Sequence, residues 1–288
     1  MNPSIEQALS KYRCQNVNDY ISAIREIMQE LALQGLWRAG FFDHAAFYGG
    51  TALRILYGLD RSSEDMDFSL LSTDMNFRMS SYSAALKQEL ESYGFPVEFS
   101  EKKKSRESTI DSAFLKGNTL TELISIGLTQ DKLQQVCSNN VIKIKLEIDL
   151  DPPPGFQTEN KTLLFPVPHT VKTYVLPDLL AGKLHAILFR KWGNRVKGRD
   201  WYDMVWYASR HPTANLLHLE QRIRQSGDYQ FKGHLTLERL KELLHNAIDN
   251  IDVEKLKQDV YPFVVDPNCM DVWNREFFHN VVELFKSE

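Results

Sequence analysis

The sequence predicts an α+β protein: a small mixed sheet with helices on one side, followed by a helical bundle. Residues 65–70 and 141–150 alternate apolar with polar or charged side chains at the two-residue period of a strand. Between these segments apolar residues recur at helical spacing, and after Tyr207 only helical patterns remain. We therefore expect one domain over residues 1–206, including N-terminal helices, and a helical bundle domain over residues 207–288.

The composition is that of a globular protein and excludes several functional classes. The 288 residues are 43% hydrophobic and 25% charged, which allows a sizeable core. A net charge of −4 argues against a general cationic coat, although it permits a local basic groove. Cys14, Cys137 and Cys269 form no C-x-x-C pair, so neither a disulfide framework nor a zinc site is expected. No apolar run approaches about 18 residues, so we expect a cytoplasmic protein without a membrane anchor.

A glycine pair before a helix is the first candidate for ligand binding. Gly49 and Gly50 lack a Cβ, so their backbone can approach phosphate oxygens closely. Thr51 is a good N-cap for the helix that follows, and the unpaired N–H groups of such a helix start attract anions. Arg54 would add a guanidinium for a phosphate. The alternative for Arg54 is a surface salt bridge to Glu64 or Asp60.

The strand at residues 65–70 presents two carboxylates on one face. Its period directs Asp65 and Asp67 to one side and the apolar Met66 and Phe68 to the other. Hard oxygen ligands on one face suit Mg²⁺, with Mn²⁺ as an alternative, and Mg²⁺ completes its shell with water and substrate phosphates. A small-residue turn followed by paired carboxylates is what a polymerase-type nucleotidyltransferase requires. A solvated strand end is the alternative interpretation.

The middle of the chain adds a helix and two strands. Residues 80–93 predict a helix, residues 97–100 a short strand, and residues 101–107 a charged turn. Residues 141–150 predict the clearest strand of the protein, with five apolar side chains on one face. The other face of that strand carries Lys143, Lys145, Glu147 and Asp149.

A strong helix is predicted over residues 177–192, with a cation on its apolar face. Lys183 has apolar helical neighbours, so it either extends to the surface or meets a ligand phosphate. Asp200 could orient Lys183 or Arg199, or hold the hydroxyl of an acceptor substrate. The alternative roles of Asp200 are capping and pairing with the loop that precedes it.

The loop at residues 190–199 is rich in cations and suits a triphosphate or an RNA backbone, with a solubilising role as the alternative. Its cations are Arg190, Lys191, Arg195, Lys197 and Arg199.

The C-terminal region predicts three helices with apolar stripes. They cover residues 236–248, 252–260 and 271–285, each with a residue suited to capping at its start. We expect a helical bundle that lines one side of the cleft where substrate binds, or that binds a partner.

Two ordered blocks resemble the AbiEii/AbiGii-type nucleotidyltransferase toxins, the group that includes the MenT toxins. The first block is GGTALR at residues 49–54, followed by an R-x-S-x-D-x-D pattern. The second is LAGKLHAILFRKWGNRVKGRDWYDM at residues 180–204. The family often has lysine where this chain has Tyr48, and an aromatic residue where it has Ser62. The missing lysine affects one phosphate contact and leaves the metal site intact. The residues of the R-x-S-x-D-x-D pattern are Arg61, Ser63, Asp65 and Asp67.

The resemblance implies a polymerase-β-like nucleotidyltransferase core. In such a core a third carboxylate lies on a strand beside the first two, and Glu147 matches this position better than Asp149. The implied metal ligands are Asp65, Asp67 and Glu147. The implied nucleotide-binding residues are Gly49, Gly50, Thr51, Arg54, Ser63 and Lys183, and the catalytic set adds Lys183 and Asp200 to the three carboxylates.

The expected reaction is transfer of NMP from an NTP to an acceptor hydroxyl. By resemblance, the chain is the toxin of a bacterial toxin–antitoxin or abortive-infection pair, with an antitoxin encoded nearby and a tRNA 3′ end as acceptor. One alternative is an inactive protein of the same fold that binds nucleotide or RNA. Another is nucleotidyl transfer to a protein or a small molecule.

Overall fold

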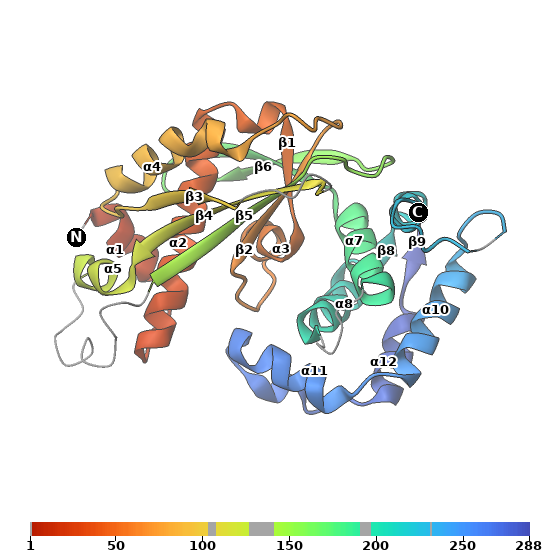
Figure 1. Cartoon of the computed structure of the whole chain (residues 1–288). Helices are drawn as coiled ribbons and strands as arrows, with labels where there is room; N and C mark the ends of the chain where they lie inside the picture. The colour runs from red at the N-terminus through yellow and green to blue at the C-terminus, as the bar shows by residue number, and fades with distance from the viewer. Residues whose placement is uncertain (1, 103–107, 127–140, 191–196, 231) are drawn as a thin grey trace. The chain divides into compact units, whose positions relative to one another are not determined.

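The computed structural model describes residues 2–102, 108–126, 141–190, 197–230 and 232–288 (Figure 1). The chain forms two compact units. Unit 1 comprises Met1–Tyr57, Ser62–Pro152 and Asn160–Thr173, and unit 2 comprises Gly58–Arg61, Pro153–Glu159 and Tyr174–Glu288.

Seven strands form one sheet: β1 (Ala45–Tyr48), β2 (Asp65–Leu70), β3 (Glu98–Glu101), β4 (Ile110–Asn118), β5 (Val141–Asp149), β6 (Thr158–Leu163) and β7 (His169–Tyr174). Their order across the sheet is β3-β4-β5-β2-β1-β7-β6. β2 runs parallel to β5 and β1 runs parallel to β7, whereas β1 with β2, β3 with β4 and β4 with β5 are antiparallel. The predicted mixed sheet is therefore confirmed.

The helices of unit 1 share one hydrophobic core with the apolar face of this sheet. They are α1 (Pro3–Leu9), α2 (Val17–Arg38), η1 (Phe41–Asp43), α3 (Gly49–Tyr57), η2 (Met79–Tyr82), α4 (Ser83–Ser92) and α5 (Thr119–Ser125). A capping box starts α2, because Asn16 Oδ1 accepts from Asp19 N–H and the Asp19 carboxylate accepts from Asn16 N–H, each at 3.1 Å. The core joins Ile27 and Leu31 of α2 to Met66 and Phe68 of β2.

The opposite side of the sheet carries the polar side chains. Along β5 the even-numbered residues, such as Leu146 and Ile148, are buried, while Lys145 and Glu147 are half-buried. β2 alternates in the same way over residues 65–68, with Met66 and Phe68 in the core, whereas Ser69 and Leu70 are both buried. We call the side that bears the odd-numbered residues of β2 and β5 the open face of the sheet.

Unit 2 is mainly helical. Its elements are α7 (Leu176–Phe189), α8 (Gly198–Arg210), β8 (Thr213–Ala214), α9 (Leu216–Gln225), α10 (Leu237–Asp249), α11 (Val253–Val260), η3 (Tyr261–Phe263), η4 (Pro267–Met270), α12 (Arg275–Glu283) and β9 (Lys286–Ser287). β8 and β9 form a short parallel pair that the helical patterns did not predict. The boundary expected between residues 206 and 207 falls inside α8, because α8 packs against α7, α11 and α12 of the same unit.

Side-chain caps set where the C-terminal helices begin. Thr236 accepts from Arg239 N–H, and Asp252 accepts from Lys255 N–H. The last helix begins later than residue 271 because Asn274 is its cap and accepts from Phe277 N–H at 2.8 Å. In the described part of the chain, no helix has the length and apolar character needed to cross a membrane.

Candidate functional site

Four side chains form a row across the open face of the sheet. Asp67 of β2 is in register with Glu147 of the parallel strand β5 and with Tyr48 of β1, and Glu147 is in register with Ser112 of β4. Registered neighbours have Cβ atoms about 5 Å apart. Asp65 lies one step along β2, where it is exposed and in register with a lysine of β5. The structure thus places three of the predicted carboxylates on adjacent positions of one face.

Glu147 is held by two polar neighbours. Its Oε1 lies 2.7 Å from Lys145 Nζ, and the Ser112 hydroxyl donates to the same oxygen at 3.1 Å. The Lys145 and Glu147 side chains are only 29% and 27% exposed, which limits the mobility of both. The sequence interpretation did not assign a role to Lys145. The signal was present, because alternation along the strand places Lys145 and Glu147 on the same side.

The alternative third carboxylate, Asp149, occupies a different place. It is in register with Ser69 instead of Asp67. Its Oδ1 accepts from Asp151 N–H at 3.1 Å and so stabilises the turn that ends β5. The register therefore brings Glu147, and not Asp149, directly beside Asp67.

Gly49 provides the space in which the Asp67 carboxylate lies. Its φ of +82° is in the left-handed region, and a Cβ there would overlap Asp67 Oδ2 and lie 3.1 Å from Asp67 Cβ and Cγ. Only glycine satisfies both conditions without strain. From the sequence we expected this glycine to leave room for a phosphate. In the structure, the missing Cβ leaves room for the Asp67 carboxylate.

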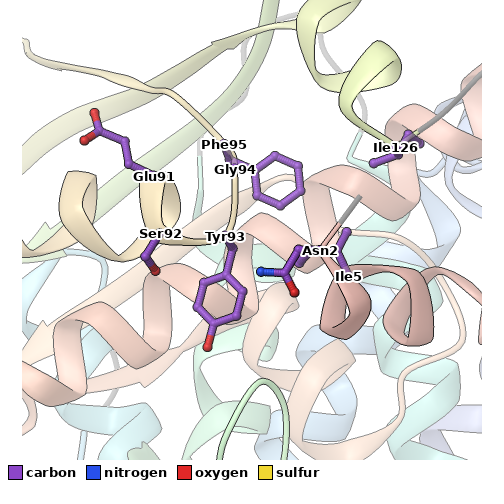
Figure 2. A pocket seen from close by; sticks show the side chains of 8 residues that line it. All are labelled: Asn2, Ile5, Glu91, Ser92, Tyr93, Gly94, Phe95 and Ile126. Atoms are coloured by element: carbon purple, nitrogen blue, oxygen red, sulfur yellow. The ribbon is translucent and has the colours of Figure 1, made fainter.

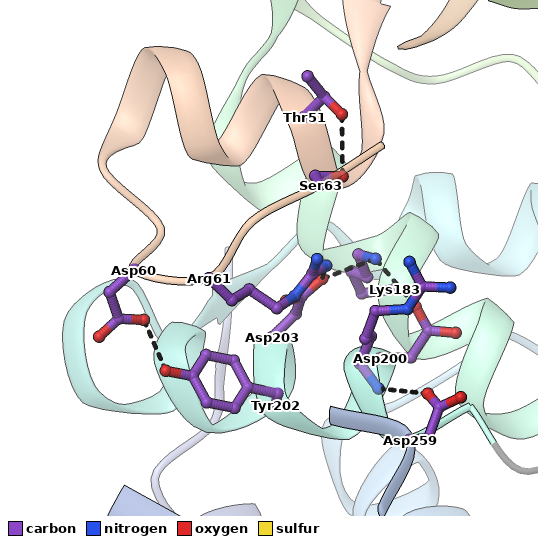
Figure 3. Close-up of polar contacts among 10 residues, drawn as sticks. Thr51, Asp60, Arg61, Ser63, Lys183, Asp200, Tyr202, Asp203 and Asp259 are labelled. Carbon is purple, nitrogen blue, oxygen red and sulfur yellow. Dashed lines mark hydrogen bonds and ion pairs between the residues drawn. The ribbon is translucent and has the colours of Figure 1, made fainter. Parts of the chain in front are cut away.

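Thr51 is not an N-cap, because α3 already begins at Gly49. The Thr51 side chain is instead fully buried. Its hydroxyl hydrogen-bonds to Ser63 Oγ at 2.9 Å (Figure 3) and donates to the backbone carbonyl of Asp65. Gln29 of α2 donates to the carbonyls of Ser63 and Glu64 at 3.2 and 3.0 Å. These bonds fix the chain where it enters the strand that carries the aspartates.

Arg54 pairs with an acid of α2. Its Nε donates to Glu26 Oε2 at 3.0 Å, and its side chain is 28% exposed. The sequence named Glu64 as an alternative partner, but Glu64 pairs with Arg25 at 3.1 Å. A phosphate contact by Arg54 would compete with the Glu26 ion pair.

The carboxylates of the open face supply hard oxygen donors but are not assembled around a cation. Within the described residues, no three His, Cys, Asp or Glu side chains are grouped so that they could hold a metal ion. The Lys145 ammonium, 2.7 Å from Glu147 Oε1, supplies a positive charge beside this carboxylate. The donor types fit Mg²⁺ or Mn²⁺, and a third ligand from Glu147 requires Lys145 to release it.

Unit 2 contains a buried ion network around Lys183 (Figure 3). Lys183 Nζ lies 2.9 Å from Asp200 Oδ1 and 2.7 Å from Asp203 Oδ2. Arg61 donates to both oxygens of Asp203 at 2.7 Å. Asp200 thus contacts Lys183, and the Lys183 side chain is 14% exposed instead of extending into solvent.

The charges of this network set the pKa values of its members. Burial alone would lower the pKa of Lys183, but Asp200 and Asp203 offset burial and raise it. Burial would raise the pKa of Asp203, but Arg61 and Lys183 reverse this and hold it below its usual value. Lys183, Arg61 and Asp203 therefore stay charged.

The segment Gly58–Arg61 is attached to α8 by two residues. Besides the Arg61 pair, Tyr202 Oη donates to Asp60 at 2.8 Å (Figure 3). Arg61 also forms an isolated β-bridge with Val264. The sequence interpretation used Arg61 only as part of a motif. Its buried partner could have been suspected from Asp203, which lies on the same helix face as Asp200.

The predicted basic loop is only partly within the described residues. Lys191 and Arg195 lie outside them. Arg190 is exposed at the end of α7, and Lys197 lines a cavity of about 380 Å³ with Trp201 and Lys255. The Arg199 guanidinium lies over the Phe263 ring, 4.1 Å from its centroid.

A second cavity, in unit 1, lies away from the predicted residues. Figure 2 shows this space of about 350 Å³, lined among others by Asn2, Ile5, Tyr93 and Phe95. Apolar side chains and residues at the ends of helices line this cavity. None of the predicted site residues lines it.

Residues 31–276 match the family model described as nucleotidyl transferase AbiEii toxin, type IV toxin–antitoxin system. No match is found among curated proteins. The chain is similar to the crystal structure of a candidate nucleotidyltransferase from Helicobacter pylori, with 19% identity, a TM-score of 0.50 and 91% of each chain covered. It is also similar to JHP933 from Helicobacter pylori, with 18% identity, a TM-score of 0.51, and 91% of this chain and 88% of that chain covered.

The chain belongs to the AbiEii nucleotidyl transferase toxin family. The family resemblance and the enzyme class expected from the sequence are therefore confirmed. The two solved structures support the fold, which agrees with the predicted nucleotidyltransferase core.

Proposed function

We propose that this chain moves NMP from an NTP to an acceptor hydroxyl with the help of divalent metal, Mg²⁺ or Mn²⁺. The observation that carries the proposal is the register of Asp67 with Glu147, with Asp65 one step away on the same face. Asp65 and Asp67 would hold the metal, and Glu147 would complete its ligands on the acceptor side. Bound metal supplies charge stabilisation at the attacking and leaving oxygens of an in-line displacement.

The residues around these carboxylates would position them. Gly49 leaves room for Asp67, and Thr51 with Ser63 fixes the start of the strand. The Gly49–Gly50 turn remains the proposed contact for the β- and γ-phosphates, with Arg54 as a further candidate. Lys145 would hold Glu147 in place before metal binds and release it afterwards.

Lys183 and Asp200 keep proposed catalytic roles. Lys183 would meet substrate phosphate, and Asp200 would orient it; the bond of 2.9 Å between them supports the orienting role. Since Asp203 already holds Lys183 at 2.7 Å, the ammonium has a fixed position instead of a range of rotamers. Such preorganisation reduces the ordering cost of each phosphate contact.

The biological role follows from the family. We propose a toxin of a bacterial toxin–antitoxin or abortive-infection pair that acts in the cytoplasm, with a cognate antitoxin and a tRNA 3′ end as acceptor. An inactive binding protein of the same fold is the rival. The match over residues 31–276 to a family of nucleotidyl transferases disfavours the rival.

Transfer of label from α-³²P-labelled NTPs to cellular RNA, with and without Mg²⁺, tests the proposal. Asp65→Asn and Asp67→Asn should abolish labelling while circular dichroism stays unchanged. Asp149→Asn, on the same face of β5 but out of register with Asp67, is the matched control and should retain labelling. Full labelling by either of the first two variants, or equal labelling without metal, contradicts the assignment.

A further inference from the structure

The open face continues from the carboxylates into a lysine-rich surface. Three lysines and one aromatic ring occupy neighbouring positions of β4 and β5. Phe114 is in register with Lys145, and Lys116 is in register with Lys143. We call Phe114, Lys116 and Lys143 the lysine face.

In the described part of unit 1, the three side chains of the lysine face are at least partly exposed, so a ligand can reach them. Lys143 is exposed, and Phe114 and Lys116 are partly exposed. The Lys143 ammonium lies 3.8 Å from the centroid of the Phe114 ring, which attracts a cation but leaves its charge uncompensated. Within the described residues neither Lys116 nor Lys143 has a carboxylate within salt-bridge distance, although Glu98 is in register with Lys116. Lys145, in contrast, is paired with Glu147.

The lysine face lies to one side of Glu147, toward the N-terminal end of β5. Strand residues rise about 3.3 Å each, so Lys143 lies about 13 Å from Glu147 along β5. Phe114 lies between them, in register with Lys145. Asp67 and Glu147 therefore share one row of the open face, Asp65, Lys145 and Phe114 share the next row, and Lys116 and Lys143 share the row after it.

We propose that the lysine face binds the 3′-terminal segment of a single-stranded RNA acceptor. The terminal hydroxyl would lie at Glu147, a base near the end would contact the Phe114 ring, and the phosphates would lie against Lys116 and Lys143. Aromatic rings beside cations are the common means of holding single strands, because every base can stack and every phosphate is anionic. This inference rests on the proposed transfer to RNA and names the surface that holds the acceptor.

The lysines of this surface lie next to the rows of the metal ligands. Phe114 is in the same row as Asp65 and Lys145, and Lys116 and Lys143 lie two residues further, about 7 Å from that row and about 13 Å from the row of Glu147. Because the α-phosphate of the NTP must lie at the metal ligands, we assign these two lysines to the acceptor backbone.

Binding of a fluorescein-labelled single-stranded RNA of about ten nucleotides, without NTP or metal, tests the inference. Lys116→Ala combined with Lys143→Ala should reduce the slope of log K against log salt by about 1.4, since each single-strand phosphate contact contributes about 0.7. Arg at both positions should preserve the slope. Phe114→Leu should weaken binding without changing the slope. Lys87→Ala, an exposed lysine of α4 on the helical layer, is the control and should leave binding as it is.

NTP affinity measured by calorimetry provides the second readout. The double alanine variant should bind NTP within about twofold of the parent, because the proposal assigns both lysines to the acceptor backbone and not to the triphosphate. An unchanged salt slope, or a loss of NTP affinity as large as the loss of RNA affinity, overturns the inference. The RNA titration measures binding alone, so its result does not depend on whether nucleotidyl transfer is detected.

Discussion

Replacing Asp203 by asparagine should destabilise the protein through the buried ion network. Asp203 is fully buried and bonds to both Arg61 and Lys183 at 2.7 Å. Asparagine has nearly the same shape but no charge, so two buried cations would share the single carboxylate of Asp200. The side-chain volume stays nearly the same, so the change in free energy reports the lost charge together with the hydrogen bond that the asparagine NH2 group cannot accept.

The loss of unfolding free energy caused by Asp203→Asn can be estimated from the burial of the ion pairs that Asp203 forms. Removing one partner of a buried ion pair costs about 3–5 kcal/mol, which is a large part of a typical stability of about 5–15 kcal/mol. The corresponding fall in Tm is about 10 °C. Because Arg61 and Lys183 hold the folded pKa of Asp203 below the usual 3.8, the stability it provides is complete above about pH 4 and is lost as pH falls further.

Urea unfolding followed by circular dichroism at pH 7 measures this cost. Asp200→Asn is the matched control: Asp200 is 14% exposed and bonds only to Lys183 among the network members, so its loss should cost about 1–2 kcal/mol. If Asp203→Asn lies within about 1 kcal/mol of the parent, or costs no more than Asp200→Asn, the network does not stabilise the fold as described.

Two further substitutions test the buried acid Glu30 of α2 and the glycine that packs against Asp67. Burial, assisted by Glu26, raises the pKa of Glu30 from 4.5 to about 7, so the parent loses stability as pH rises through this interval. Glu30→Gln should therefore match the parent near pH 4 and be more stable above pH 7 by up to about 3 kcal/mol, as measured by urea unfolding; equal stability at pH 8 would refute the shift. Gly49→Ala should lower transfer by about a hundredfold, because the added Cβ displaces Asp67. Gly94→Ala, with φ of +92° and nothing near the added Cβ, is its control and should keep full activity.

The sequence predicted well those features that depend on local periodicity. Alternation placed Asp65 and Asp67 on one face of β2 and Glu147 on the polar face of β5. The strand order that brings β2 beside β5 follows from the fold family and not from either segment alone. Only the register showed that Glu147, and not Asp149, is the neighbour of Asp67.

The features that escaped prediction depend on contacts between distant residues. Arg61 and Asp203 are 142 positions apart, and no local pattern reveals their pairing. Thr51 resembles an N-cap because its hydroxyl precedes an apolar stripe, but its bonds to the segment before β2 require the folded chain. The role of Gly49 likewise depends on the carboxylate packed against it.

Binding of Mn²⁺ to the protein without NTP, followed by the loss of the free Mn²⁺ electron paramagnetic resonance signal, tests the central claim most directly, because NTP itself chelates the ion. The claim is that Asp65, Asp67 and Glu147 hold the catalytic metal. The parent should bind Mn²⁺, Asp67→Asn should lose this binding, and Asp149→Asn should retain it. Equal Mn²⁺ binding by the parent and Asp67→Asn would contradict the metal site on the open face of the sheet.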